Sequence, residues 1–189
     1  MKTVPIWISN RHIHLSQSDA NKLFGEGYEL KKFKDLSQPW QYACEEIVTI
    51  KWPKWQLDGV RILGPYRKDT QVEVMLWDCF KLWVQAPIRL SGDLDGTPGI
   101  EITGTNWSVV IEKWVIVAQR HIHMSLDEAS NYGLVDGQIV SVKVSWERGL
   151  TFNEVVVRAN ANWALDMHID IEEGNAAGVK NWTQAEIVS

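Results

Sequence analysis

Histidine spacing carries the first chemical signal in this chain. Four of the five histidines form two His-x-His pairs, His12 with His14 and His121 with His123. Side chains at positions i and i+2 of a β-strand share one face, so each pair would present two imidazoles together. Paired imidazoles suit zinc. A single such pair would more often be an exposed or hydrogen-bonded strand feature, but its repetition favours metal binding.

The two pairs belong to a longer internal repeat. ISNRHIHLSQSDANKLFG begins at Ile8, and VAQRHIHMSLDEASNYG begins at Val117, which is an offset of 109 residues. Arg-His-Ile-His, an apolar residue, a serine and an acidic helix start recur in the same order. The repeat predicts two related halves.

Further ligands are needed if two metal ions each keep an open position for substrate, because such sites have about three protein ligands each. His168, in the alternating segment DMHID, could be the fifth histidine ligand, although alone it would more often be structural. A carboxylate would be the sixth. Glu73 in TQVEV is the candidate, since an unpartnered carboxylate between apolar neighbours is costly. The alternative, which is more frequent for an alternating strand, is that Glu73 faces solvent and binds no metal.

Arginines lie next to these residues. Arg11 and Arg120 directly precede the histidine pairs, and Arg67 follows Gly-Pro-Tyr shortly before Glu73. A guanidinium group binds phosphate in a bidentate manner, so these residues suggest an anionic substrate. Arginines at turns are, however, usually only solvated. The chain has no glycine-rich phosphate loop, GxSxG motif or dinucleotide-binding fingerprint.

The elements that must position these side chains are short strands and short helices. Helices are expected after Ser16 and Ser125, ending near Gly25 and Gly133, and Asp170 should cap one over 172–177. Residues 91–98 are rich in turn-forming residues and are the best candidate for a loop or linker. Strands are expected at 4–8, 46–52, 60–63, 71–76, 99–103, 108–111, 115–118, 138–144 and 154–158. The frequency of short strands favours barrels or sandwiches.

Composition excludes several classes of protein. The 189 residues carry a net charge of −5, the wrong sign for a chain that mainly binds nucleic acid or an anionic membrane. Cys44 and Cys79 lie outside any CxxC motif, so neither a disulfide framework nor a thiolate zinc site is expected. No segment is long and apolar enough for a membrane span or a signal peptide. A cytoplasmic location is therefore expected.

Several ordered motifs together carry a specific resemblance. SNRHIHLS, KDLSQPWQ, ILGPYRKDTQVE, RLSGDLDGTPGI, RHIHMS and ALDMHID make residues 4–188 resemble the phosphate propanoyltransferase (phosphotransacylase) family. The resemblance implies a mainly β fold with short helices. It implies two small β-barrel domains related by an internal duplication and capped by short α-helices. Their expected boundaries are 11–118, with the first His-x-His pair, and 1–10 plus 119–189, with the second pair.

The resemblance also implies a site. His12, His14 and His168 would hold one zinc ion, and Glu73, His121 and His123 the other, although other divalent metals suit the same ligands. Arg67 would bind phosphate. Coenzyme A would bind near a subunit interface, at Ser9, Lys34, Gln41, Arg61, Leu63 and Asn175.

The implied reaction converts acyl-CoA and phosphate, reversibly, into acyl phosphate and free CoA, with an acetyl or propanoyl group. Phosphate would attack the thioester directly at a dinuclear site, so neither cysteine is needed as a nucleophile. The resemblance further implies a homodimer, and a free cytoplasmic enzyme is expected because no microcompartment-targeting helix precedes the motifs. Two alternatives stay open: a dinuclear metal-dependent hydrolase of thioesters or phosphate esters, and a metal-binding or assembly module.

Tryptophan is unusually frequent, with 11 residues. The resemblance implies that glycine is usual at nine of these positions: Trp7, Trp40, Trp52, Trp55, Trp83, Trp107, Trp114, Trp146 and Trp182. A binding surface and deliberate engineering are two explanations. The preferred hypothesis is that UGA codons, read as glycine in the source organism, have been written as tryptophan. Asn106-Trp107 and Asn181-Trp182 support it, because Asn-Gly is the turn sequence expected there.

Overall fold

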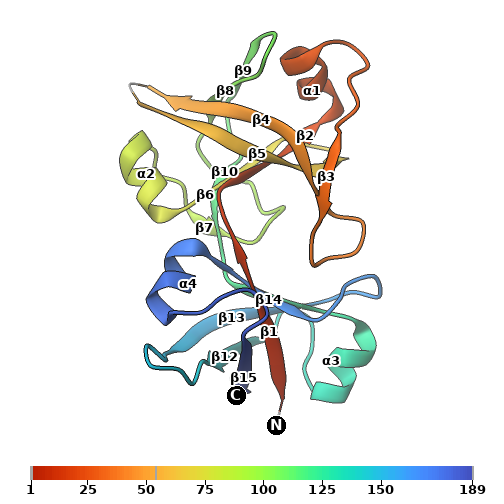
Figure 1. Cartoon of the computed structure of the whole chain (residues 1–189), viewed down its shortest axis with the longest axis vertical. Coiled ribbons are helices and arrows are strands. Elements are labelled where there is room, and N and C mark those ends of the chain that lie inside the picture. Colours follow the sequence, from red (N-terminus) through yellow and green to blue (C-terminus); the bar gives the residue numbers. More distant parts are fainter. Residues whose placement is uncertain (1, 54, 189) are drawn as a thin grey trace. The chain divides into compact units, whose positions relative to one another are not determined.

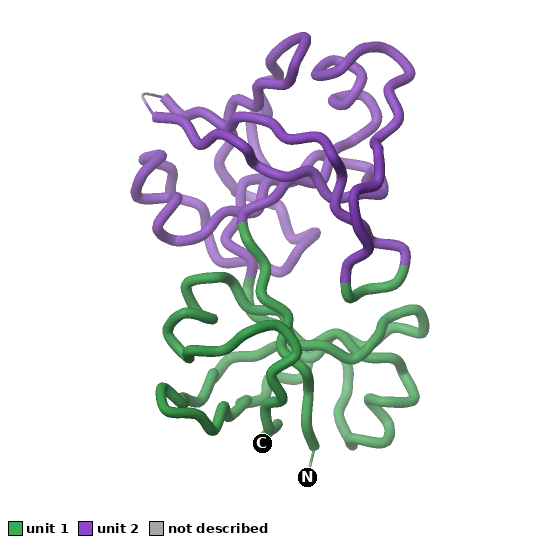
Figure 2. Tube along the Cα trace, in the orientation of Figure 1, with its two compact units in different colours: residues 1–10, 37–39, 119–189 green, residues 11–36, 40–118 purple. Residues whose placement is uncertain are grey.

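The computed structural model describes residues 2–53 and 55–188 and contains two compact units (Figures 1 and 2). Unit 1 comprises residues 1–10, 37–39 and 119–189, and unit 2 comprises residues 11–36 and 40–118. The expected class, mainly β with short helices, is confirmed. Every helix in the described ranges falls far short of the length and apolar character needed to cross a bilayer.

Unit 1 is a closed six-stranded barrel in the order β1-β14-β11-β13-β12-β15. β1 runs parallel to β14 and antiparallel to β15, which closes the barrel. Alternate side chains such as Ile6, Ile122 and Met167 fill the core. The strands are Thr3–Ser9 (β1), His121–Met124 (β11), Ile139–Lys143 (β12), Thr151–Ala159 (β13), Asp166–Asp170 (β14) and Gln184–Val188 (β15), and the helices are Leu126–Tyr132 (α3) and Ile171–Ala177 (α4).

Unit 2 is a nine-stranded sheet in the order β7-β10-β6-β2-β5-β4-β8-β9, with β3 paired to β4. Within the described residues this order does not close, so only unit 1 forms the closed barrel that the resemblance implied for both domains. The strands are His12–Ser16 (β2), Lys32–Asp35 (β3), Tyr42–Trp52 (β4), Trp55–Arg67 (β5), Gln71–Val74 (β6), Ile88–Arg89 (β7), Ile100–Thr103 (β8), Ser108–Ile111 (β9) and Val115–Ala118 (β10), and the helices are Gln17–Phe24 (α1) and Leu76–Leu82 (α2).

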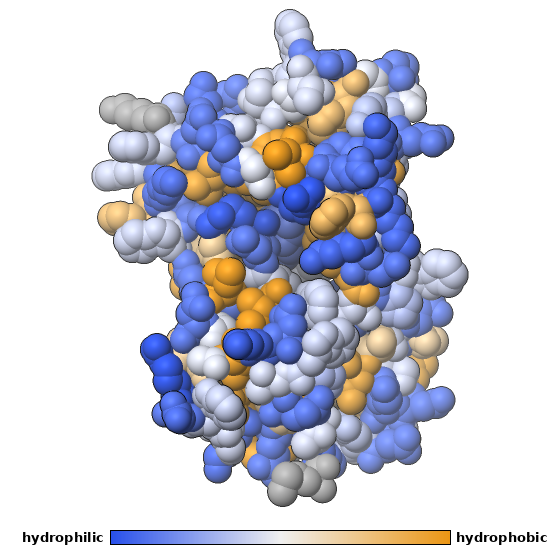
Figure 3. Space-filling view, viewed as in Figure 1, coloured by the Kyte–Doolittle hydropathy of each residue, from blue (hydrophilic) through white to orange (hydrophobic). Residues whose placement is uncertain are grey.

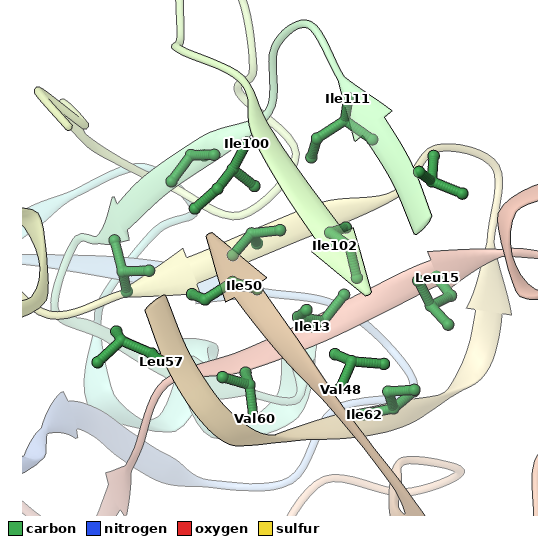
Figure 4. Packing of buried hydrophobic residues seen from close by; sticks show 14 of the residues in the cluster. Ile13, Leu15, Val48, Ile50, Leu57, Val60, Ile62, Ile100, Ile102 and Ile111 are labelled. Atoms are coloured by element: carbon green, nitrogen blue, oxygen red, sulfur yellow. The ribbon is translucent and has the colours of Figure 1, made fainter. Parts of the chain in front are cut away.

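The core of unit 2 is built from branched aliphatic side chains on neighbouring strands (Figure 4). Ile13, Ile50, Ile62 and Ile102 have no exposed surface. Because side chains alternate along a strand, burying Ile13 in this core directs His12 and His14 to the opposite face of β2. The face of the molecule in Figure 3 shows only scattered hydrophobic patches among hydrophilic residues.

The internal repeat is visible in the strand pairing. β10-β6-β2-β5-β4 in unit 2 follows the same order as β1-β14-β11-β13-β12 in unit 1. The orientations agree pair by pair: β10–β6 and β1–β14 are parallel, β2–β6 and β11–β14 are antiparallel, and β2–β5 and β11–β13 are parallel. Each sheet therefore places its His-x-His strand between the same two neighbours.

The expected helix starts are confirmed. Ser16, Ser125 and Asp170 each accept a hydrogen bond from the backbone N–H three residues on. α2 was not expected, because residues 71–76 were assigned to one strand. β6 ends at Val74, and Asp78 accepts a 3.1 Å hydrogen bond from the Met75 N–H. A methionine at the cap position carries none of the usual sequence signals for a helix start.

One segment lies in a different unit from the one in which the expected domain boundaries place it. Ser37–Pro39, which lies inside the expected 11–118 domain, packs with unit 1. Gln38 explains this, since its side chain donates to Ala164 O (2.8 Å) and accepts from Ala164 N (3.1 Å).

Four tryptophans adopt left-handed backbone conformations. Trp40, Trp83, Trp114 and Trp182 have φ of 66°, 56°, 91° and 71°, and Glu154 is the fifth non-glycine residue with positive φ in the described ranges. Positive φ is sterically unfavourable for a residue with a bulky side chain and costs glycine nothing. All four belong to the nine positions at which glycine was expected.

Candidate metal centres and anion site

The six predicted metal ligands form two groups, one in each unit. His12, His14 and Glu73 lie together in unit 2, and His121, His123 and His168 lie together in unit 1. Within each group the potential ligand atoms are within 4.8 Å of one another. The groups differ from those that the resemblance implied, because His168 lies with the second histidine pair and Glu73 with the first.

Strand register explains this grouping. On the antiparallel pair β2–β6, His12 is the direct partner of Glu73. On the equivalent pair β11–β14, His121 is the partner of His168. Directly opposite residues in an antiparallel pair have adjacent side chains on the same face. The third ligand of each group is therefore a cross-strand neighbour of the histidine pair in its own sheet.

Glu73 faces both histidines of unit 2. Its carboxylate oxygens lie 3.3 Å from His12 Nε2 and 3.8 Å from His14 Nε2. Burial would raise the pKa of Glu73, but the neighbouring imidazoles hold it well below its ordinary value. Burial, together with the charges of His12 and Arg67, keeps the pKa of His14 well below 6.5. A carboxylate beside imidazole nitrogens is a donor set suited to a divalent cation.

In unit 1, burial and the two neighbouring imidazoles lower the pKa of His121 well below 6.5. Burial also lowers the pKa of His123, against the opposing effect of Asp166. His123 Nδ1 and His168 Nε2 are buried beside a carboxylate oxygen of Asp166. Each imidazole has a second ring nitrogen that can ligate a metal ion, which requires a deprotonated ligand.

Asp166 lies beside two histidines of unit 1, His123 and His168. One carboxylate oxygen is 3.0 Å from His168 Nε2 and 3.6 Å from His123 Nδ1, and the same oxygen accepts a 2.7 Å hydrogen bond from Gln38. Burial would raise the pKa of Asp166, but its contacts with the imidazoles keep it far below the ordinary value. Asp166 is thus an ionised carboxylate held against two candidate ligands.

Arg67 is linked to the ligand group of unit 2 through a chain of hydrogen bonds. Its guanidinium donates to Ser91 Oγ (2.9 Å), and Gln71 Nε2 donates both to Ser91 Oγ (2.9 Å) and to Glu73 Oε1 (2.6 Å). The Gly92 N–H donates to Gln71 Oε1 at 2.9 Å. The arrangement directs a permanent positive charge toward the candidate metal ligands.

Four of the positions nominated for coenzyme A lie in unit 2. Arg61 and Leu63 on β5 are register partners of His12 and His14. Leu63 is in turn opposite Ala43 of β4, which pairs with Lys34 of β3. These residues form one row across three strands, next to the histidine strand. Gln41 directly precedes β4 and accepts a hydrogen bond from the Leu36 N–H through its backbone oxygen.

The other two nominated positions lie in unit 1, where Ser9 ends β1 and Asn175 is exposed on α4. Sequence reasoning missed Gln38, Gln71, Ser91 and Asp166. Gln71 and Asp166 could have been found, because each is two residues before a predicted ligand on a strand and so shares its face. Gln38 and Ser91 had no comparable signal, since both lie on loops.

The fold and these groups define a two-unit β protein with a candidate divalent-metal site in each unit and an arginine beside one of them. The family profile for phosphate propanoyltransferase matches residues 5–180. A phosphate propanoyltransferase of Thermotoga maritima is 53% identical over 91% of this chain and 82% of its own length. The corresponding proteins of Clostridioides difficile and Rhodopseudomonas palustris are 48% and 49% identical, over 98% and 94% of this chain and 88% and 79% of their own lengths.

These similarities extend over nearly the whole chain, and they agree with the motifs in the sequence. The chain belongs to the phosphate propanoyltransferase family. It is accordingly an enzyme of the acyltransferase class.

Proposed function

We propose that the enzyme transfers an acetyl or propanoyl group between coenzyme A and phosphate, with one divalent metal ion, zinc foremost, in each ligand group. The observation that carries this proposal is the hydrogen-bonded chain from Arg67 through Ser91 and Gln71 to Glu73. It combines a phosphate-binding guanidinium with a metal-ligand group in one network. A purely structural metal site has no need for such a cation.

In this proposal His12, His14 and Glu73 hold one ion, and His121, His123 and His168 hold the other. When bound, the ions would supply positive charge for the phosphate and for the developing negative charge on the thioester oxygen. The low pKa values of His14 and His121 keep these imidazoles neutral at physiological pH, as ligation requires.

Arg67 binds the phosphate and orients one of its oxygens toward the thioester carbon. Ser91 restricts the guanidinium through its 2.9 Å hydrogen bond, so the cation is positioned before substrate arrives. The phosphate oxygen forms a bond to the acyl carbon, the carbon–sulfur bond breaks, and the CoA thiolate leaves with the electron pair. No covalent acyl-enzyme is required.

Coenzyme A binding is assigned to Ser9, Lys34, Gln41, Arg61, Leu63 and Asn175, and the enzyme is a homodimer in this proposal. Exposed apolar side chains on α2 support self-association: Trp77 and Phe80 stack at 5.5 Å and are 65% and 71% exposed. Light scattering should give twice the chain mass for the wild type and a smaller mass for Phe80→Glu. Val135→Glu, at an exposed position of unit 1, is the matched control.

The test of the reaction is a CoA-release assay with acetyl-CoA and propanoyl-CoA, with and without phosphate, before and after metal removal. Phosphate-dependent turnover that is lost with the metal supports the proposal. CoA release without phosphate would identify a thioester hydrolase, and no release from folded, metal-loaded protein would identify a binding module. Arg67→Gln should raise the KM for phosphate about 10–100-fold, the range expected for a lost hydrogen bond to a charged group, whereas Arg89→Gln should not.

A further inference from the structure

Each unit contains an ion pair at the same place relative to its ligand group. Arg11 Nε lies 2.8 Å from Asp78 Oδ2 in unit 2, and Arg120 Nε lies 2.9 Å from Glu173 Oε1 in unit 1. Each arginine directly precedes a His-x-His pair. Each carboxylate lies in the first turn of the helix that follows the strand carrying the third ligand.

The carboxylates also hold the corner between that strand and its helix. Asp78 Oδ2 accepts from the Met75 N–H at 3.1 Å, and Glu173 Oε2 accepts from the Asp170 N–H at 3.0 Å. Met75 is two residues after Glu73, and Asp170 is two residues after His168. Each ion pair therefore connects the residue before the histidine pair to the corner directly after the third ligand.

Both ion pairs are at least partly buried, the one in unit 2 more than the one in unit 1. The Asp78 side chain is 1% exposed, and the Arg11 side chain is 27% exposed. The Arg120 and Glu173 side chains are 34% and 22% exposed. A buried carboxylate without a cation is costly, so its arginine is restricted to one position. The planar guanidinium also fixes direction, which a lysine ammonium does not.

We propose that Arg11 and Arg120 are positioning residues, each of which holds the third metal ligand of its unit in register with the histidine pair. The recurrence of the same contact in both units, with Asp in one and Glu in the other, supports a shared role. Groups that hydrogen-bond directly to a metal ligand typically contribute about 10–100-fold to metal affinity. These ion pairs act on the third ligand through two residues of backbone, so a loss at the lower end of that range is expected. The inference rests on the metal groups of the proposed function and not on its reaction.

Cadmium binding to Arg11→Gln and Arg120→Gln, with no acyl-CoA present, tests this proposal. Cadmium NMR should give separate signals for the two groups because their donor atoms differ, and chelator competition gives each affinity. Arg11→Gln should weaken cadmium binding about 10-fold in the group of unit 2 alone, and Arg120→Gln should do the same in the group of unit 1 alone. Arg11→Lys should restore little, because it lacks the planar fork.

Arg89→Gln is the matched control, since it removes an exposed arginine whose Nε is 3.5 Å from Asp93. Unchanged cadmium affinities in both arginine variants, or an equal decrease in both groups, would overturn the proposal. If Arg11→Gln does not fold, Asp78→Asn tests the same contact, because its amide oxygen can still accept the Met75 N–H. Cadmium binding by the wild type with no CoA release would count against the reaction and leave the positioning role intact.

Discussion

Trp83 and Gly178 occupy equivalent positions in the two units. Each is the left-handed residue that ends the helix after the strand carrying the third ligand, with φ of 56° and 65°. Each backbone N–H bonds the carbonyls three and four residues earlier. Glycine is the usual residue in this conformation, and a tryptophan there is strained. The equivalent position in the other unit is a glycine, so glycine is the residue expected at position 83.

Replacing each of the four tryptophans that have a left-handed backbone conformation by glycine should stabilise the protein. Trp40→Gly, Trp83→Gly, Trp114→Gly and Trp182→Gly should each raise the free energy of unfolding by about 1 kcal/mol, by relieving backbone strain. Urea unfolding measures this change. Trp77→Gly, in the helix α2, is the control and should instead destabilise by about 0.5–1 kcal/mol. The gene should carry UGA at most of the tryptophan positions, and UGG throughout would refute the recoding hypothesis.

Asp166 should support metal binding in unit 1. Asp166→Asn removes the charge beside His123 and His168 but keeps the shape of the side chain, so cadmium affinity of that group should fall about 10–100-fold. Gln38→Ala should have a smaller effect in the same direction, because Gln38 donates to Asp166. Asp58→Asn, at an exposed position on β5, is the control. An unchanged affinity in Asp166→Asn would assign this carboxylate a purely structural role.

Metal-free protein should lose stability as the pH is lowered from about 7 to about 5. Burial holds the pKa values of three histidines, His14, His121 and His123, below the ordinary 6.5. Just below pH 6.5 the unfolded chain therefore binds more protons than the folded chain. Protons therefore favour unfolding there, and stability returns as the pH rises through 6.5. Urea titrations of chelator-treated protein measure this dependence. Saturating zinc should raise stability at neutral pH, and a pH-independent midpoint of the metal-free form would contradict the argument.

Neither cysteine should be needed for turnover. Cys44 is buried, and this burial, together with a smaller effect of the Glu46 charge, raises the pKa of its thiol to about 12. Almost no thiolate therefore exists near neutral pH. Cys44→Ala and Cys79→Ala should keep phosphate-dependent CoA release close to the wild-type rate, measured on protein shown to be folded. Loss of turnover in either folded variant would favour a covalent acyl-enzyme over direct attack by phosphate.

Much of the fold could be predicted from local signals. The helix caps at Ser16, Ser125 and Asp170 follow from side-chain chemistry within one turn, and strands such as Ser108–Ile111 and Val115–Ala118 follow from β-branched runs. These elements depend on neighbours along the chain, which a sequence displays. α2 lacked a recognisable cap at Met75, so its start was read as the end of a strand.

The candidate site likewise has features that follow from the local sequence and features that depend on residues far apart in the chain. The six ligand types and the His-x-His geometry could be predicted, because strand alternation is local. Which third residue joins which pair depends on strand register, so the placement of Glu73 opposite His12 and His168 opposite His121 required the structure. Asp166 and Gln38 contact each other across 128 positions of the chain, beyond any spacing rule.

The first strand of each repeat belongs to the sheet that contains the other repeat's histidine pair. β1 precedes the first histidine pair but belongs to unit 1, and β10 precedes the second pair but belongs to unit 2. Each repeat thus completes its sheet with the opening strand of the other. A single copy of the repeat would reach the same pairing only by swapping that strand with a second copy, which is a low-cost route to a dimer. The present chain has the connectivity that a strand-swapped dimer would have if its two copies were fused into one polypeptide, so cutting it between the repeats should yield two fragments that fold only together.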